Sequence, residues 1–464
     1  MDINKKLKLL FITYTYSNGG GAEKVLTTFV NNLDSTKYDI SIFEIVKYNV
    51  KREPINSNIK LLPSLYCYND PNYKIKVLDY LLEQKPEIIR SLRSLDAYDI
   101  IISWNYQKPS FMLPAFEDKK TIAWFHESID GLRITNPEPG LQYYRSLQIE
   151  AWKYADKIVA ISNKCFTSLG EVFPEYLNKT EIVYNPIELD EIRTKAKINV
   201  MDDFKKHGFP FLICIGRLDK NKNISLVIHS LAKLNRMGIP CGLLVVGMGE
   251  EERNLKEEAK TLNISDNIFF LGYQQNPISY LNKAIVLCVA SFSEGWGLTV
   301  CEAMALGIPF VTTPVAGASE ELAYGGKCGL VADWNVDDYA EKLKILLTDV
   351  ALYNKMSNNC LERIKDFSVE NAIVDFNNLL ASLPEKENIP TRNISKIEAI
   401  KQIHAIYVWY PDNILKNIKF SVNRFKNTKK IYHFLLIGYH IAQFLLYGLT
   451  TPYRIFTVKN TLGV

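Results

Sequence analysis

One stretch, residues 288–309, limits the possible folds of this chain more than any other. An apolar run over 285–290 is typical of a buried strand. A loop with two glycines follows it, and then a segment with helical spacing that ends at Gly307 and Pro309. Strand, loop and helix in this order predict one unit of a parallel α/β sheet, whose ligands bind where the strands end.

Two carboxylates lie within this unit, eight positions apart. Glu294 falls in the loop, and Glu302 falls on about the second turn of the helix. Gly295 and Gly297 leave the backbone N–H groups at the helix start accessible, which favours an anion there. We therefore predict a polar ligand-binding site at the carboxyl end of this strand.

The same alternation of strand and helix recurs along the chain. Strands are predicted at residues 9–16, 40–46, 99–104, 121–125, 157–161 and 182–184, and again at 211–215, 241–246, 268–271, 285–290 and 310–313. The polar stretch 188–208 separates the two sets and is the expected domain boundary. We predict two doubly wound parallel-sheet domains of the α/β class, residues 1–190 and 200–366, that face each other across a cleft, with the helix 367–383 packing back on the first.

The charge of the chain is unevenly distributed. The net charge of the 464 residues is +4, but residues 413–464 carry eight basic and no acidic residues, so the preceding part has a net charge of −4. A body of this composition gives no reason to expect a nucleic-acid partner. The basic end indicates an acidic surface as its partner.

Residues 394–464 form a basic and apolar helical tail in this interpretation. Residues 416–430 include six basic residues, and residues 431–449 have no charge. The uncharged run is long enough to span a bilayer, but His433, His440, Gln443 and Tyr447 fall on one helical face. This polar stripe favours a helix at an anionic membrane surface, on the cytoplasmic face, over a hairpin packed on the body or a true span.

The eight cysteines include no C-x-x-C pair, and several fall inside apolar strand or helix patterns. Buried free thiols in a reducing compartment are the expected interpretation. The apolar run that follows the N-terminal lysines is too short for the core of a signal peptide and is better explained as the first strand.

Two further features lie at the ends of predicted strands in the first domain. Gly20 and Gly21 belong to a glycine-rich loop that lets the backbone approach a ligand, although a tight turn without a ligand explains it equally well. The loop does not match G-x-G-x-x-G, so no dinucleotide is implied. His126 follows a strand, where a histidine is well placed for chemistry, but a structural hydrogen-bonded histidine is the more common case.

Together these motifs resemble a glycosyltransferase of the GT-B fold, family 4 type, over about residues 7–383. The resemblance depends on six motifs in the order of the family: Gly20-Gly-Ala-Glu23, His126, Asn185-Pro186, Gly216-Arg-Leu with Lys222-Asn223, Gly247-Met-Gly-Glu250, and the E-x7-E pair of Glu294 and Glu302.

The resemblance implies transfer of a hexose or N-acetylhexosamine from a nucleotide sugar, with retention at the anomeric carbon and no metal or other cofactor. A UDP-linked donor is favoured over a GDP-linked one. The acceptor would be a saccharide or a lipid-linked saccharide, as in the synthesis of capsule or lipopolysaccharide. Glu302 would hold the ribose and Glu294 the donor sugar, and His126 would lie beside sugar and acceptor. The expected donor-binding residues are Gly20, Gly21, Asn185, Gly216, Gly247, Gly295, Trp296, Gly297, Leu298 and Glu302.

Arg217 and Lys222 have an independent physical rationale. Negative charge builds on the leaving diphosphate as the bond to the sugar breaks, and both cations lie on a loop after a strand, where they can reach it. Trp296 would support the donor loop rather than touch the donor. The residues leave the retaining mechanism open, because none is an assured nucleophile and front-face attack remains an alternative.

Other classes compete with a transferase on this scaffold. A GT-B epimerase or phosphorylase is one alternative, although a phosphorylase needs a cofactor lysine in a much longer chain. A non-catalytic interaction protein is another, but it has no need for Arg217, Lys222, Glu294 and Glu302 together.

Overall fold

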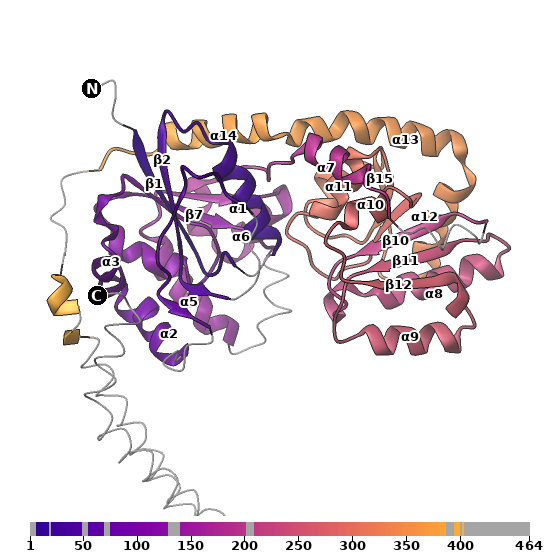
Figure 1. Ribbon diagram of the computed structural model, residues 1–464, viewed down its shortest axis with the longest axis horizontal. Coiled ribbons are helices and arrows are strands. Elements are labelled where there is room, and N and C mark those ends of the chain that lie inside the picture. Colours follow the sequence, from indigo (N-terminus) through magenta and orange to yellow (C-terminus); the bar gives the residue numbers. More distant parts are fainter. Residues whose placement is uncertain are drawn as a thin grey trace, which may run out of the picture.

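The computed structural model describes residues 6–17, 20–48, 54–68, 75–128, 140–200, 208–386, 394–399 and 401–402. It contains two parallel β-sheets, each covered by helices on both faces, side by side along the long axis of the molecule (Figure 1). Two packed α/β domains, as predicted, are the GT-B arrangement.

The first sheet has the strand order β4-β2-β1-β6-β7-β8-β9, and all its pairs are parallel. Its strands are β1 (Leu7–Thr13), β2 (Tyr38–Glu44), β4 (Lys60–Leu61), β6 (Ile100–Ser103), β7 (Lys120–Phe125), β8 (Lys157–Ala160) and β9 (Thr180–Ile182). A small parallel pair, β3 (Val46–Lys47) and β5 (Tyr66–Cys67), lies apart from it. The helices of this part are α1 (Gly21–Asn32), α2 (Ile75–Gln84), α3 (Pro86–Leu92), η1 (Leu95–Ala97), η2 (Ser110–Phe116), α5 (Gly140–Trp152), α6 (Asn163–Val172) and η3 (Pro174–Lys179).

The second sheet has the order β12-β11-β10-β13-β14-β15 and is also parallel throughout. Its strands are β10 (Phe211–Ile215), β11 (Gly242–Val246), β12 (Ile268–Gly272), β13 (Val286–Val289), β14 (Phe310–Thr312) and β15 (Gly329–Val331). The remaining helices are α7 (Leu189–Ala196), η5 (Lys220–Lys222), α8 (Ile224–Arg236), α9 (Glu252–Thr261), η6 (Ser265–Asn267), α10 (Pro277–Leu281), α11 (Leu298–Ala305), the π-helical turn η7 (Ala318–Leu322), α12 (Val336–Thr348), α13 (Val350–Arg363), η8 (Ile364–Phe367) and α14 (Val369–Ala381).

The strand order explains where a ligand can bind. In the second sheet, β10 lies between β11 and β13, so the chain moves outward in opposite directions from β10. Loops that leave the two neighbouring strands β10 and β13 at their carboxyl ends therefore diverge and leave a crevice. Gly216, Arg217, Lys222 and Glu294 line this crevice.

The main chain crosses between the domains twice, and the two crossings lie together. After β9 the chain enters α7, and η8 later leads it back to α14. Ile187 and Ser368, one from each crossing, form an isolated parallel β-bridge. The rings of Tyr184, Trp296 and Phe367 pack beside this bridge, with centroid separations of 5.0–5.3 Å.

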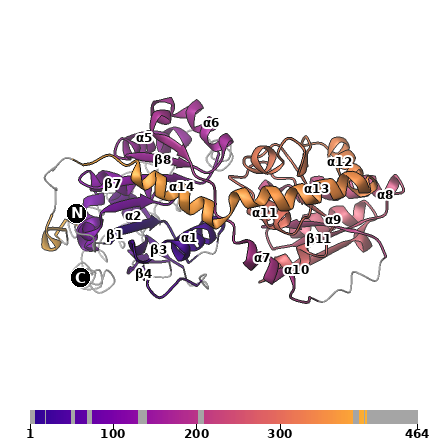
Figure 2. The same ribbon diagram turned by 90° about the horizontal axis from the view of Figure 1, so that it is seen from above.

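The last described long helix returns to the first domain. Figure 2 shows α13 lying along the second domain and α14 continuing over the first sheet. Phe376 of α14 lies 5.7 Å from Phe29 and 6.3 Å from Phe11, measured between ring centroids. The Tyr38 hydroxyl donates to Asn377 Oδ1 at 2.7 Å, which adds a polar contact to this packing.

The structure differs from the sequence expectation in two helical segments. Residues 86–92 form α3, a helix that the sequence analysis does not predict. Residues 189–196, inside the expected polar boundary, form α7. The helix α7 is largely polar and buries only Ile192 and Ala196 fully, so its apolar pattern is too weak to recognise.

The cysteines are free in the structure, and Cys67 is exposed while the other seven are buried. Among the residues that the structure describes, no helix combines the length and apolar character needed to cross a membrane. The basic tail, residues 413–464, lies outside the described residues.

Candidate active site

Glu294 and Lys222 meet at the carboxyl ends of β13 and β10. The Lys222 ammonium donates to Glu294 Oε1, and the Ser291 hydroxyl donates to the same oxygen at 2.7 Å. Both side chains of the ion pair are partly exposed, at 25% for Lys222 and 18% for Glu294. The pair therefore lies at the surface of the crevice, where a ligand can reach it.

Short-range backbone contacts hold Lys222 in this position. Asp219 accepts a hydrogen bond from the Lys222 backbone N–H through its side chain at 3.1 Å. Asn221 connects this turn to the loop after β13. Its side-chain N–H donates to Ser293 O at 3.0 Å, and its side-chain oxygen accepts from Ser293 N at 3.1 Å. The two loops thus behave as one unit, which fixes the distance between Lys222 and Glu294.

Arg217 differs from Lys222 in its freedom. Its side chain is 79% exposed, and its only ion pair among the described residues joins Nη2 to Asp219 Oδ2 at 3.0 Å. It shares a groove with Gly216, Lys222, Glu294 and Thr299. An exposed guanidinium at the edge of this groove can turn towards an anion without breaking buried contacts.

Two glycines allow the loops after β10 and β11 to touch. Gly247 has φ +138°, and a Cβ placed on it would lie 1.8 Å from Gly216 O. Gly216 itself has φ +150° and lies against the Lys222 stem. No side chain fits at Gly247, so this position requires glycine.

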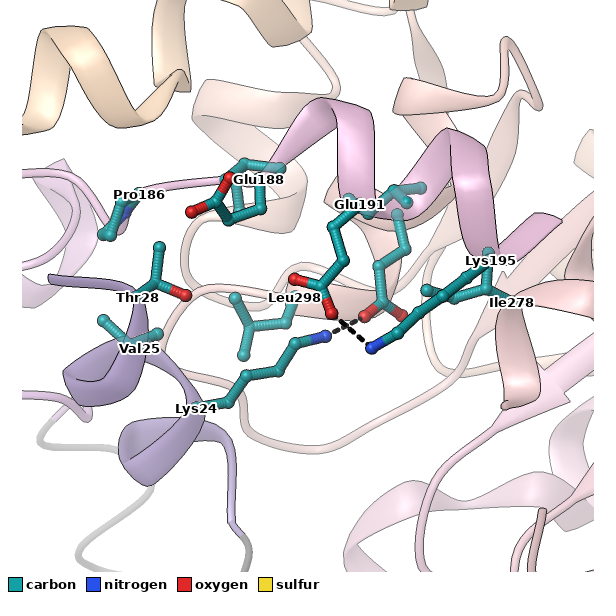
Figure 3. A pocket seen from close by; sticks show the side chains of 12 residues that line it. Lys24, Val25, Thr28, Pro186, Glu188, Glu191, Lys195, Ile278 and Leu298 are labelled. Carbon is teal, nitrogen blue, oxygen red and sulfur yellow. Dashed lines mark hydrogen bonds and ion pairs between the residues drawn. The ribbon is translucent and has the colours of Figure 1, made fainter. Parts of the chain in front are cut away.

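Glu302 is held by the other domain. It lies on α11 with its side chain 9% exposed, and Lys24 Nζ of α1 approaches Glu302 Oε1 to 2.6 Å. Figure 3 shows the Lys24 side chain extending from α1 towards Glu191 and Lys195 of α7, which form a second ion pair. The sequence indicated Glu302 but not its partner, because nothing in local spacing connects residues so far apart.

Further contacts join the domains around Gly295. A Cβ on Gly295 would lie 1.9 Å from His126 O, so the two backbones touch here. The Lys164 ammonium donates to Pro314 O at 2.8 Å. A Glu321 carboxylate oxygen accepts from the Asn163 backbone N–H at the start of α6. The structure therefore shows the two domains in contact.

Glu321 was not anticipated from the sequence as an interdomain residue. It is 4% exposed, and burial raises the pKa of its carboxyl. The sequence shows only the pair Glu320-Glu321 after the predicted strand 310–313. Two acidic residues at a solvated helix terminus explain that pair equally well.

His126 is half-buried where the backbones of the two domains touch at Gly295. Burial lowers the pKa of His126 to about 3, while a hydrogen bond to the backbone of Trp104 opposes that shift. Its Nε2 atom is buried and has no hydrogen-bond partner among the described residues. The bond to Trp104 therefore uses Nδ1–H, which leaves an unprotonated Nε2 that can accept a hydrogen bond.

We expect the His126 ring to remain neutral between about pH 8 and about pH 5. The unfolded chain takes up this proton near the ordinary pKa of 6.5 and the folded chain only near 3. The free energy of unfolding is therefore unaffected by this group above pH 6.5, and it decreases as the pH falls from 6.5 towards 3. Histidine-ring NMR, assigned with a His126→Asn variant, should show no titration of His126 in this range; a midpoint near 6.5 would contradict the buried neutral state.

The other expected donor-binding residues fall into two groups. The first group lies where the starts of two helices face each other. Gly20 and Gly297 are the N-caps of α1 and α11, and a Cβ on Gly21 would lie 3.2 Å from Leu298 Cδ1. Asn18 and Gly19, in the same glycine-rich loop, lie outside the described residues.

Trp296 and Asn185 form the second group, because both are buried. Trp296 is 2% exposed and packs on Tyr184 and Phe367 under the donor loop, the supporting position that the sequence favoured. Asn185 is 3% exposed, and its Oδ1 has no hydrogen-bond partner among the described residues. Neither side chain reaches the open groove in this arrangement of the domains. Across the described residues, no cluster of three or more histidine, cysteine or acidic side chains could hold a metal ion.

Comparisons with known proteins agree with this geometry. Two family models match the chain in succession, Glycosyltransferase Family 4 over residues 19–191 and Glycosyl transferases group 1 over residues 199–363. A Campylobacter jejuni N-acetylgalactosaminyltransferase acting on N-acetylgalactosamine-N,N'-diacetylbacillosaminyl-diphospho-undecaprenol is 26% identical over 76% of this chain and 94% of its own length. A glycosyltransferase of Methanocaldococcus jannaschii is 27% identical over 74% of this chain and 89% of its own.

Solved structures show the same fold. The Anabaena HepE protein in complex with UDP matches with a TM-score of 0.63 at 16% identity, over 81% of this chain and all of its own. The lipopolysaccharide outer core galactosyltransferase WaaB matches with a TM-score of 0.60 at 18% identity, over 81% and 99% of the two chains.

The fold and the two successive matches define the class of this protein, which is a glycosyltransferase with the GT-B fold. Within that class, the chain belongs to glycosyltransferase family 4. Membership of this family favours a transferase over the epimerase, phosphorylase and interaction-protein alternatives.

Proposed function

We propose that this glycosyltransferase moves a hexose or N-acetylhexosamine from a nucleotide sugar, with a UDP-linked donor favoured over a GDP-linked one. The acceptor is a saccharide or a lipid-linked saccharide, and the transfer retains the configuration at the anomeric carbon. The observation that carries the proposal is the meeting of Arg217, Lys222 and Glu294 where β10 and β13 end. Two cations and one carboxylate in one groove match the two halves of the donor, a diphosphate and a sugar.

In this proposal the two cations bind the leaving diphosphate. Lys222 is held by its neighbours and supplies a fixed point charge, while the exposed Arg217 supplies a planar fork of N–H donors. Donors that are already in position cost no reorganisation when negative charge develops on the β-phosphate. The N–H groups at the start of α11, behind Gly297, add further donors on the same side.

Glu302 and Glu294 would fix the two ends of the donor. Glu302 accepts from Lys24 through Oε1, so its other oxygen can accept hydrogen bonds from the ribose hydroxyls. Glu294 would accept from hydroxyls of the donor sugar. His126, as a neutral ring, would lie beside that sugar and the acceptor.

The contacts of Glu294 favour front-face attack over a covalent route. Its Oε1 is bound by both Lys222 and Ser291, which lowers its nucleophilicity. In the front-face route, the acceptor oxygen bonds to the anomeric carbon on the side from which the diphosphate departs. A β-phosphate oxygen then takes the hydroxyl proton, so no protein base is needed.

The acceptor proposal is supported by relatives in Campylobacter jejuni whose names specify diphospho-undecaprenol-linked sugars. The basic tail, residues 413–464, would add attraction to the anionic membrane in which such lipids lie. We place the enzyme at the cytoplasmic face of that membrane, as a peripheral protein.

A donor screen tests this function. The full-length protein should release UDP from at least one UDP-sugar when diphospho-undecaprenol carrying N-acetylgalactosamine is present, and mass spectrometry should show one sugar added to the lipid. Proton NMR of the product distinguishes retention from inversion. The proposal would be overturned if no UDP-sugar or GDP-sugar released its nucleotide in the presence of this or any other saccharide acceptor.

The same preparation addresses the tail. A variant that lacks residues 394–464 should no longer sediment with vesicles rich in anionic lipid, but it should still bind UDP. Unchanged sedimentation would exclude the tail as the membrane-binding segment.

A further inference from the structure

Glu127 follows His126 at the carboxyl end of β7 and has no role in the proposed function. A Cβ on Gly295 would lie 1.9 Å from His126 O and 3.4 Å from the Glu127 Cα. The backbone of Glu127 therefore adjoins the donor loop of the other domain. Since Gly295 follows Glu294 directly, Glu127 lies beside the proposed position of the donor sugar.

The environment of Glu127 combines solvent access with protein on several sides, as expected at the floor of an open cleft. Burial raises the pKa of its carboxyl, and the positive charge of Arg217 across the cleft opposes that shift. The negative charge of Glu127 is in turn felt by Tyr106, on the side of the first domain. The Glu127 carboxylate is thus within electrostatic reach of Tyr106 in the first domain and of Arg217 in the second.

The other carboxylates near the cleft already have partners. Glu294 binds Lys222, Glu302 binds Lys24, and Glu321 accepts from the start of α6. Among the residues that the structure describes, none forms a hydrogen bond or ion pair with the Glu127 carboxylate. Glu127 is thus an exposed acceptor without a hydrogen-bond partner among the described residues, next to the proposed reacting centre.

We propose that Glu127 binds the attacking hydroxyl of the acceptor, and that this acceptor ends in a neutral sugar. The inference rests on the proposed function, because it takes the donor sugar to lie between Glu294 and the two cations. An ionised carboxylate accepts a strong hydrogen bond from a hydroxyl and so orients its oxygen towards the anomeric carbon.

The transfer step remains balanced with Glu127 in this role. The acceptor oxygen forms its bond to the anomeric carbon while the bond from that carbon to the diphosphate oxygen breaks with its electron pair. The hydroxyl proton passes to the departing diphosphate, and Glu127 stays ionised throughout. Glu127 therefore acts on the position of the hydroxyl and not as the final proton acceptor.

The charge around this position explains the preference for a neutral sugar. The donor brings a diphosphate, and Glu127 adds a carboxylate with no ion-pair partner among the described residues. A uronic acid or phosphorylated sugar would place a further negative charge within a few ångströms of both, which is unfavourable in a cleft of reduced dielectric. A neutral hexose or N-acetylhexosamine carries no such penalty.

The test compares Glu127→Gln, Glu127→Asp and the native enzyme on two acceptors, diphospho-undecaprenol that ends in N-acetylgalactosamine and the same lipid ending in galacturonic acid. We expect Glu127→Gln to raise the KM for the neutral acceptor about tenfold or more, with the Kd for UDP and the melting temperature unchanged. Glu127→Asp, which keeps the charge, should recover part of the loss. Glu117→Gln, an exposed residue of the same domain, is the matched control and should behave like the native enzyme.

The acceptor comparison tests the charge preference. The native enzyme should use the neutral acceptor at least tenfold better than the anionic one, and Glu127→Gln should reduce that ratio severalfold. A native KM in Glu127→Gln would overturn the inference, and so would an equal loss of UDP affinity or thermal stability, which would indicate a structural role. No transfer by the native enzyme would instead overturn the proposed function, and this inference with it.

Discussion

Lys222→Met should lower kcat by about a hundredfold to a thousandfold, the loss typical of removing one preorganised donor from a developing oxyanion. Methionine keeps most of the apolar stem, which packs on Gly216, and removes the ammonium that would face the leaving diphosphate. Nucleotide release and transfer, measured with saturating donor, report the effect. The affinity for UDP should fall as well, because the diphosphate carries most of its charge before the reaction.

Lys220→Met is the matched control for this experiment. Lys220 lies two residues away in the same turn and is exposed, and it forms no ion pair with any described residue. Its replacement should change kcat less than threefold. If both variants lost activity equally, the general positive charge of the turn, and not the position of Lys222, would explain the effect.

Gly295→Ala should lower kcat/KM by about a hundredfold, because misplacement of reacting groups by about 1 Å costs a factor of this size. The new Cβ would overlap His126 O, and the domains can relieve the overlap only by separating. Such a separation moves Glu294 away from the first domain. UDP binding should persist, since every residue assigned to the diphosphate belongs to the second domain.

Kinetics and small-angle scattering together test this second expectation. The variant should have a slightly larger radius of gyration than the native protein, with a similar melting temperature. Gly170→Ala is a suitable control, because a Cβ there meets only side-chain atoms of Leu177, away from the cleft. Native turnover in Gly295→Ala would show that the contact with His126 O is not required for transfer.

Local patterns predicted most strands of both sheets and the edge at which the candidate site lies, but not the short strands β4, β5 and β15. The apolar run before Glu294 forms β13, and the loops with Arg217 and Lys222 leave the neighbouring strand β10 at the same end. Parallel strands bring their carboxyl ends to one edge, so residues far apart in the sequence could be assigned to one groove. Ser162 directly follows the predicted strand 157–161 and is of a residue type that commonly caps helices, and its hydroxyl accepts from Cys165 N at 3.1 Å.

The contacts between the domains could not be predicted in this way. Whether Lys24 reaches Glu302 depends on the orientation of two separately folded units, and the spacing within either unit contains no information about it. The contact of Glu321 with the start of α6 could not be predicted for the same reason, because it also joins the two domains. The helix α7 was missed for a different reason, since a short polar helix that buries little surface lacks a clear apolar period.

The bridge between Ile187 and Ser368 has a consequence for motion. A single connection between two bodies permits rotation about several axes, whereas two connections that lie side by side restrict it. The aromatic rings packed at this point add resistance to twisting. Rotation about an axis through this bridge is therefore the least hindered movement of the two domains, and closure about that axis would bring Glu294 and His126 back to the same register.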